Sequence, residues 1–251
     1  AEFNERKFIA RRGTMELKKG DVVNLGTGIP NDMVGSVCIE EGINDDIMIT
    51  VESGIYGGQQ AGGIDFGIGQ NLVAMITHHE QMDYYNGAGV DCTFMGFGEL
   101  DQEGNVNSTK MGSRCTGAGG FIDITQNAKK VVFLGTFTAS GAKYKFEKDK
   151  LTILQEGKIR KMVNKVAQIS FNGKIAREKG QEVMIVTERA VFKLCKEGVE
   201  LIEVAPGIDL QTQVLDMMGF KPILSKEIKI MNKELFNKDT IFNLKKILEE
   251  K

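Results

Sequence analysis

Ile47-Met48-Ile49-Thr50-Val51-Glu52-Ser53-Gly54-Ile55-Tyr56-Gly57-Gly58 passes within a few residues from an apolar, β-branched run to an acid and then to glycines. The run at 47–51 has no helical period, which predicts a strand buried on both faces, as in a parallel sheet. Glu52 follows at the carboxyl end of this strand, where open α/β sheets bind ligands, and glycines there let the backbone approach a ligand closely. We therefore expect Glu52 to be either a functional carboxylate or a paired structural one.

A glycine-rich turn lies upstream of this stretch. The apolar residues 22–25 predict a strand that runs into Gly26-Thr27-Gly28-Ile29-Pro30-Asn31, where Pro30 suits the first position of a helix. Such a turn exposes backbone N–H groups at the positive end of a helix dipole, which favours a phosphate or carbonyl oxygen. The full G-x-G-x-x-G pattern and the P-loop lysine are missing, so neither dinucleotide binding nor a Walker-type site is supported. A plain connecting turn is the alternative.

Further apolar segments complete the predicted sheet. The strands expected downstream of a glycine-studded loop at 59–70 are residues 72–77, 90–95, 131–137, 166–171, 183–187, 191–195 and 199–204. The expected helices are residues 4–19 with Asn4 as N-cap, 210–218 and 240–248. Alternating lysines and apolar residues at 144–157 predict an additional β-hairpin region. The sequence thus predicts an α/β fold with an open, mainly parallel sheet flanked by helices, in a single domain over residues 1–251.

Composition narrows the class of protein. A formal net charge of −2 argues against a nucleic-acid-binding surface over the whole domain, and no run approaches the roughly 20 apolar residues that span a bilayer. The charged start without an apolar signal core and the four widely spaced cysteines predict a cytoplasmic protein with reduced thiols. His78 and His79 lack metal-ligand spacing, so we expect surface or supporting roles for them and no metal site.

Three glycine turns, at Gly26, Gly54 and Gly119, would meet around Glu52 at one edge of this sheet. A glutamate carboxylate has a reference pKa of about 4.3, so it is ionised at neutral pH and can act as a nucleophile without a partner base. Attack on a thioester generates an oxyanion, which backbone N–H groups stabilise by on the order of 100- to 1,000-fold in rate for one donor. The alternative for Glu52 is a carboxylate that caps a helix or pairs with a lysine.

Taken in order, these motifs resemble those of a known family. Glu52-Ser53-Gly54 with Gly57-Gly58, the upstream Gly26-Thr27-Gly28-Ile29-Pro30-Asn31 and the downstream Gly117-Ala118-Gly119-Gly120-Phe121-Ile122-Asp123 look like the glutamate, coenzyme A and oxyanion motifs of family I coenzyme A transferases. The resemblance covers nearly the whole chain. It is strongest to the β subunit, or to the carboxyl-terminal half of the fused propionate and acetate transferases.

The resemblance implies a covalent mechanism. Glu52 would attack an acyl-CoA, a γ-glutamyl-CoA thioester would form, and an acceptor carboxylic acid would then receive the CoA. Gly119 or Gly120 would supply a backbone donor to the oxyanion. Coenzyme A and acyl-CoA would be substrates, with no permanently bound cofactor. The residues expected to bind CoA are Gly26, Gly28, Ile29, Pro30, Asn31 and Gly117, with Lys143 as a further candidate.

Only half of the family pattern is present. In the family the other half contributes part of the acyl pocket and another oxyanion donor, so the resemblance implies an α-type subunit or an N-terminal half as partner, in a hetero-oligomer such as (αβ)n. Ser53, where some relatives have asparagine, favours short-chain propionate and acetate substrates over succinyl ones. An acyl-CoA hydrolase on the same scaffold and a non-catalytic acyl- or CoA-sensing module stay open, although a sensor has no need of a nucleophilic Glu52.

Overall fold

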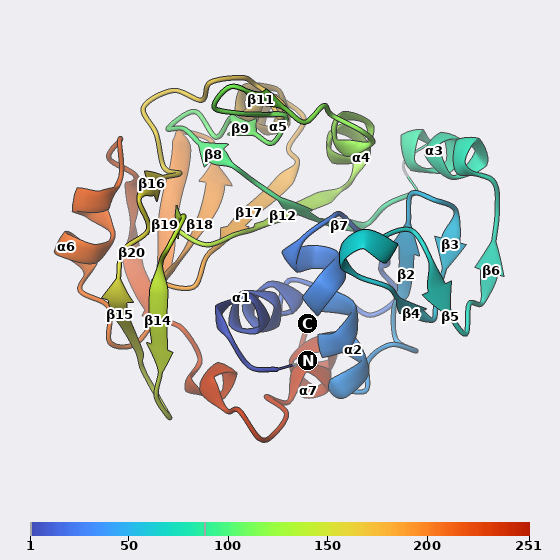
Figure 1. Ribbon diagram of the computed structural model, residues 1–251, viewed down its shortest axis with the longest axis horizontal. Helices are drawn as coiled ribbons and strands as arrows, with labels where there is room; N and C mark the ends of the chain where they lie inside the picture. Colours follow the sequence, from blue (N-terminus) through green and yellow to red (C-terminus); the bar gives the residue numbers. More distant parts are fainter. Residues whose placement is uncertain (1, 88) are drawn as a thin grey trace.

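One mixed sheet runs through the computed structural model, which describes residues 2–87 and 89–251 (Figure 1). The strands in order across the sheet are β20 (Ile223–Ile230), β19 (Gly198–Val204), β18 (Ala190–Cys195), β17 (Glu182–Val186), β12 (Lys130–Leu134), β7 (Cys92–Gly96), β1 (Val22–Leu25), β2 (Met48–Val51), β3 (Ile55–Tyr56) and β6 (Ala74–Met75). Among these strands, β18 and β3 run against the direction of the others. The predicted open, mainly parallel sheet is confirmed.

Helices cover both faces of the sheet. They are α1 (Glu5–Thr14), the π-helix η1 (Pro30–Val34), α2 (Gly35–Glu40), η2 (Gly63–Asp65), α3 (His78–Asn86), α4 (Phe121–Asn127), α5 (Gly173–Glu178), α6 (Leu210–Gln213), η3 (Leu215–Met217), η4 (Lys233–Phe236) and α7 (Leu244–Glu249). One core lies between the sheet and α1, α2 and α7, and a second lies under α3, α4 and α5. Val132 and Leu134 of β12 point into the first core, whereas Val131 and Phe133 point into the second, because side chains alternate along a strand.

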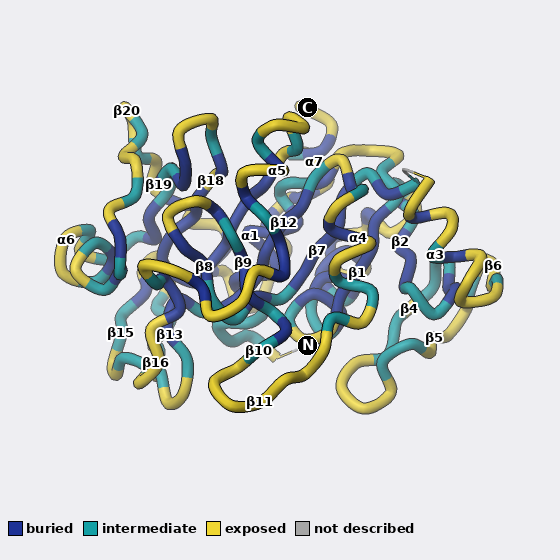
Figure 2. The backbone as a smooth tube through the Cα atoms, turned by 90° about the horizontal axis from the view of Figure 1, so that it is seen from above, coloured by how far each residue is buried: buried dark blue, intermediate teal, exposed yellow. Residues whose placement is uncertain are grey.

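Burial is concentrated in the central strands. Figure 2 shows β7 and β12 dark blue in the middle of the molecule, with exposed connections around them. The short two-stranded sheets are β4 (Gln59–Gln60) with β5 (Gly69–Gln70), β8 (Glu99–Leu100) with β9 (Val106–Asn107), β10 (Lys110–Met111) with β11 (Arg114–Cys115), β13 (Thr138–Ala139) with β16 (Ile159–Arg160), and β14 (Lys143–Phe146) with β15 (Leu151–Gln155). The last pair is the predicted additional hairpin. Among the helices of the described residues, none has the length and apolar character needed to cross a bilayer.

Two helix starts follow their sequence signals. The Asn4 side chain accepts hydrogen bonds from the backbone N–H groups of Arg6 (3.0 Å) and Lys7 (3.1 Å), as expected of an N-cap. The helix ends at Thr14 and not at the expected residue 19. Pro30 is the first residue of η1, as predicted for the helix after the glycine turn.

One predicted strand is shorter than expected and another is wrong. Within residues 72–77 the strand is limited to β6, because β3 offers two residues and the Thr77–Glu80 capping box starts α3 at His78. Residues 166–171 form no strand and make one isolated bridge, between Val106 and Phe171. The expected helix at 210–218 is interrupted at Val214, whose backbone is not helical (φ −121°), and the final helix begins at Leu244 and not at 240. The helices α3 and α5 and the edge strand β20 were not anticipated.

Candidate active site

Three neighbouring parallel strands end at one pocket. Strand β1 is followed by Gly26 and Thr27, β2 by Glu52, and β7 ends at Gly96. These four residues line a pocket of about 450 Å³ together with the loop 116–120 that leads into α4. Carboxyl ends of parallel strands meet at one edge of a sheet, so the strand order β7-β1-β2 brings segments far apart in sequence to a common place.

Glu52 occupies the pocket with an incompletely satisfied carboxyl group. Burial raises the pKa of Glu52, while its own backbone N–H, hydrogen bonding from the Asn24 side chain and the charge of His78 act in the opposite direction. The Oε2 atom is buried and has no hydrogen-bond partner within residues 2–87 and 89–251. A carboxylate that is partly withdrawn from water and not tied up by a cation keeps its lone pairs available for an electrophile.

Backbone N–H groups line the same pocket as this carboxylate. Gly117, Ala118, Gly119 and Gly120 all line the pocket, and their N–H groups donate no hydrogen bond to any described residue. Gly119 has φ +52°, in the left-handed region that glycine adopts readily, and a Cβ there would meet open space. The loop is therefore free to offer N–H groups to an oxyanion in the pocket.

The structure brings some of the predicted site residues together and leaves others apart. Gly26, Gly117, Gly119 and Gly120 line the same pocket as Glu52. Lys143 does not: it is exposed on β14, which Figure 1 places on the opposite side of the molecule from β2.

Residues 28–31 of the first glycine turn are not among those that line the pocket. Gly28 is exposed, Ile29 packs against the core of α1 and α2, and Pro30 is buried at the start of η1. Asn31 is also buried, and its Nδ2 donates a hydrogen bond to the carbonyl oxygen of Ala61. The side chains of Ile29, Pro30 and Asn31 are engaged in packing or hydrogen bonding within the protein, so the groups that this part of the turn can offer to a ligand are those of its backbone.

The expected loop at 59–70 is an ordered hairpin anchored to both glycine turns. Ser53 Oγ donates to the Gly67 carbonyl oxygen (2.9 Å), and the Gly63 N–H donates to Asp32 Oδ1 (3.1 Å). With the Asn31 bond to Ala61, these contacts tie the hairpin to the residue that follows Glu52 and to the start of η1. The hairpin therefore supports the turns around the pocket.

Sequence reasoning missed the polar side chains beneath Glu52. Asn24, Thr50 and Thr93 are fully buried in β1, β2 and β7, and the Tyr85 hydroxyl from α3 contacts Asn24 and Thr50. The available signal was a single polar residue inside each of three apolar strands, since buried polar groups have to find hydrogen-bond partners.

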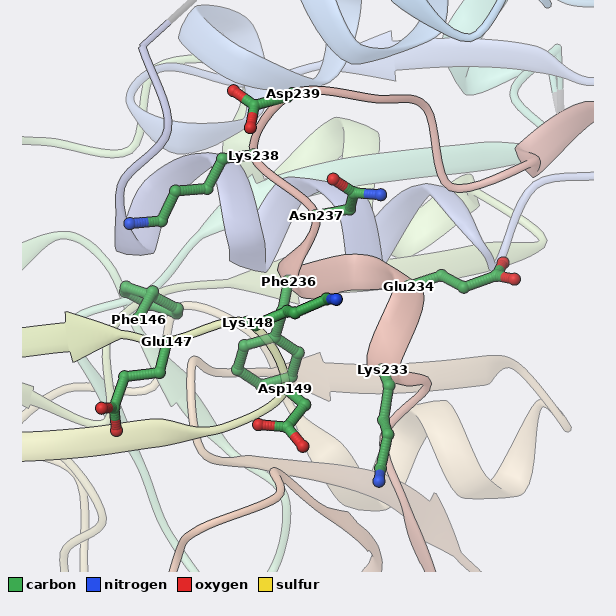
Figure 3. Close-up of a pocket in the computed structure, with 10 residues that line it drawn as sticks. All are labelled: Phe146, Glu147, Lys148, Asp149, Lys233, Glu234, Phe236, Asn237, Lys238 and Asp239. Atoms are coloured by element: carbon green, nitrogen blue, oxygen red, sulfur yellow. The ribbon is translucent and has the colours of Figure 1, made fainter.

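A larger pocket lies away from Glu52. It has a volume of about 850 Å³ and is formed by the β14–β15 turn and η4, with residues 146–149, 233, 234 and 236–239 around it (Figure 3). Lysines and acids are interspersed over the aromatic rings of Phe146 and Phe236, which lie 6.2 Å apart. No strand of the main sheet ends there, so size alone does not make it the candidate site. Within the described ranges no three His, Cys, Asp or Glu side chains are grouped to hold a metal ion.

Known proteins resemble the chain along most of its length. No family model matches it. It is 46% identical over 233 residues to the acetate CoA-transferase YdiF of Escherichia coli K12, covering 93% of this chain and 44% of that protein. It is 30% identical over 224 residues to the acetate CoA-transferase subunit beta of Haemophilus influenzae, covering 83% of this chain and 87% of that one.

A solved structure shows the same fold. The acyl-CoA transferase YdiF from Escherichia coli O157:H7, in a thioester complex with CoA, superposes with a TM-score of 0.89 at 43% identity. The match covers 96% of this chain and 45% of that one. The chain thus spans less than half the length of the single-chain relatives it matches, but most of the length of a separate β subunit.

Proposed function

This chain belongs to the family I coenzyme A transferases, and we propose that it is the half of such an enzyme that carries the nucleophile. On this proposal Glu52 accepts CoA from a short-chain acyl-CoA and passes it to a second carboxylic acid. The observation that carries the proposal is the position of Glu52 at the end of β2. Its buried Oε2 and the N–H groups of residues 117–120 share one pocket and have no hydrogen-bond partner in the described part of the chain.

The proposed reaction needs no external base. A Glu52 oxygen attacks the acyl carbonyl, the carbon–sulfur bond breaks, and a mixed anhydride and CoA thiolate result. The thiolate then attacks the Glu52 carbonyl carbon, which releases the first acid as a carboxylate and leaves a γ-glutamyl-CoA thioester. The acceptor carboxylate repeats these two steps in reverse, so Glu52 is regenerated and a new acyl-CoA leaves.

Each attack places a negative charge on a carbonyl oxygen. We assign Gly119 and Gly120 as the backbone donors for this charge, supported by their free N–H groups in the Glu52 pocket. Because these donors belong to a loop held at one side by β11 and at the other by α4, little reorganisation is needed when the charge appears.

The same proposal assigns the CoA-binding residues. Gly26 and Gly117 are supported by their place on the pocket wall, whereas Gly28, Ile29, Pro30 and Asn31 would contribute backbone groups of the turn. Because β14 is remote from β2 (Figure 1), Lys143 would have to bind a part of CoA far from the thioester, or bind CoA held by another chain of the assembled enzyme. CoA and acyl-CoA serve as substrates, and no permanently bound cofactor takes part in the proposed steps.

We further propose that residues 1–251 form a single domain and work with an α-type subunit or N-terminal half, in a hetero-oligomer of αβ pairs. The continuous sheet supports the single domain, and the match to a β subunit supports the partner. A cytoplasmic location is part of the proposal and is supported by the four cysteines, all of which are free thiols.

A transfer assay tests this function. The chain, assembled with its α-type partner, is given acetyl-CoA and isotopically labelled propionate, and the label is followed into propionyl-CoA. Transfer is expected with the native chain and with Glu178→Gln, an exposed acid on α5, and is expected to be lost in Glu52→Gln. Release of free CoA without labelled propionyl-CoA would instead identify a hydrolase.

A further inference from the structure

Three polar side chains form a row across the centre of the sheet, just before the pocket. Asn24 of β1 is in register with Thr50 of β2 on one side and with Thr93 of β7 on the other. All three are completely buried, and each strand is otherwise apolar at its buried positions, with β1 burying Val23 and Leu25 beside Asn24. Such a row is costly unless every polar atom is satisfied.

Hydrogen bonds connect the row in one direction. Thr93 Oγ1 donates to Asn24 Oδ1 (2.9 Å), and Asn24 Nδ2 donates to the Tyr85 hydroxyl (3.1 Å). Thr50 Oγ1 lies 2.7 Å from the Tyr85 hydroxyl and donates its single hydrogen to the carbonyl oxygen of Val23 (2.8 Å). Tyr85 must therefore be the donor to Thr50, and each hydroxyl hydrogen in the network has a defined place.

This network fixes which way the Asn24 amide points. Reversing the amide would place Oδ1 against the Tyr85 hydroxyl, which would then donate to Asn24 and no longer to Thr50. The Thr50 hydroxyl has one hydrogen and could donate it either to the Tyr85 hydroxyl or to the Val23 carbonyl oxygen. One of these two short contacts would then have no hydrogen between its oxygen atoms. The observed orientation satisfies all of these contacts and leaves one Nδ2 hydrogen of Asn24 unused by the network.

Glu52 is the residue that directly follows β2, next to this row. Asn24 and Thr50 are in register, so their side chains leave the same face of the sheet, and Glu52 comes two residues after Thr50 in the turn that follows β2. Hydrogen bonding from Asn24 lowers the pKa of Glu52 and so opposes the effect of burial.

We propose that Asn24 is a positioning residue for Glu52: the Thr93–Asn24–Tyr85–Thr50 network fixes the Asn24 amide so that it donates to the Glu52 carboxylate and holds it ionised and oriented for attack. This inference rests on the proposed function. It assigns a role to the single direction of a hydrogen-bond chain that begins at β7, crosses β1 and ends on β2, with α3 supplying the Tyr85 hydroxyl.

Two other groups act on the charge of Glu52, both from α3. His78, exposed at the start of this helix, favours the ionised carboxylate when it is protonated. Tyr85 opposes ionisation only if it is itself charged, and burial raises the pKa of Tyr85 far above the working range. A measurement of Glu52 ionisation is therefore best made in a His78→Gln background.

The test is the pH dependence of CoA adduct formation on Glu52. The chain, assembled with its α-type partner and carrying His78→Gln, is mixed with acetyl-CoA for a single turnover, and the adduct is quantified by mass spectrometry between pH 4 and 8. Asn24→Ala is expected to move the half-maximal pH upward by about one unit, a roughly tenfold loss of rate on the acid side. Tyr85→Phe and Thr93→Val should move it in the same direction by less.

Two substitutions serve as controls. Thr93→Ser keeps the hydroxyl and is expected to restore the half-maximal pH, and Thr14→Val removes a buried hydroxyl of α1 that bonds only the Arg11 carbonyl. Variants that lower the maximal rate or the stability while keeping the half-maximal pH of the parent would overturn the inference and leave the proposed function standing. An unmodified Glu52 in the parent enzyme would overturn the proposed function, and the inference with it.

Discussion

Ile76 and Gly54 are in direct backbone contact. The Ile76 N–H donates a 2.9 Å hydrogen bond to the Gly54 carbonyl oxygen, and the Ile76 carbonyl oxygen occupies the space that a Cβ on Gly54 would need. Gly54 also has φ +105°, a conformation that other residues rarely adopt. This contact joins the turn after Glu52 to the segment that leads into α3, and so to His78 and Tyr85.

Gly54→Ala is therefore expected to destabilise the protein strongly. The substitution combines a backbone penalty of about 1–2 kcal/mol with about 1–3 kcal/mol for overpacking against a main-chain oxygen that has little room to move. Gly20→Ala is the matched control, because Gly20 also has positive φ (+86°) but faces open space. Urea denaturation should show the larger loss for Gly54→Ala, and equal losses would mean that the close contact is unimportant.

Glu52→Gln is expected to stabilise the protein at neutral pH. Because burial raises the pKa of Glu52, the folded state binds a proton more readily than the unfolded state, and stability falls as pH rises through this range. The amide removes that penalty, with a gain of about 1 kcal/mol at pH 7 that disappears below the ordinary glutamate pKa of about 4. Thermal unfolding against pH checks this, with Glu178→Gln as the control. A loss of stability at pH 7 would contradict the account.

Lys161 gives a second pH-dependent prediction. Its ammonium group lies 3.7 Å from the centre of the Phe97 ring and makes no ion pair or hydrogen bond within the described residues, and burial lowers the pKa of Lys161 to about 7. Between pH 7 and about 10 the unfolded chain holds the proton and the folded chain does not, so stability from this group rises with pH. Lys161→Met should stabilise the protein more at pH 6 than at pH 9, by on the order of 2 kcal/mol. The same gain at both values would rule out a neutral Lys161.

Ser53→Ala should loosen the hairpin that β4 and β5 form. The Ser53 hydroxyl donates to the Gly67 carbonyl oxygen. Losing this hydrogen bond is expected to lower the free energy of opening the hairpin by about 1 kcal/mol. Because the bond acts locally, hydrogen exchange is expected to accelerate at residues 61–70 more than in the central strands. Ser225→Ala on β20 is the control. Unchanged exchange at 61–70 would show that other contacts hold the hairpin.

The strand framework around Glu52 could be predicted from the sequence. Apolar β-branched runs followed at once by glycine or acid place Gly26 and Glu52 at the carboxyl edge of a parallel sheet, and the glycine turn at Gly119 is expected at the same edge. The pocket confirms that grouping. The roles in binding and catalysis remain proposals.

The remaining features depend on tertiary contacts. The segment at 166–171 has the composition of a strand, but the neighbouring backbone offers a single bridge to Phe171. Helix α3 carries many polar residues and owes its start to the Thr77 capping box and its burial to Tyr85 and Gln81. The Asn24 network is invisible to periodicity, because its partners come from four separate elements.

The most direct test of the central claim is peptide mass spectrometry of the Glu52 segment. The chain is assembled with its α-type partner, exposed to acetyl-CoA or propionyl-CoA, and digested under conditions that preserve thioesters. The account predicts a CoA adduct on Glu52 that disappears when acetate or propionate is added, because the acid takes the CoA away. An enzyme that transfers CoA while Glu52 remains unmodified, or a Glu52→Ala variant that still transfers it, would contradict the account.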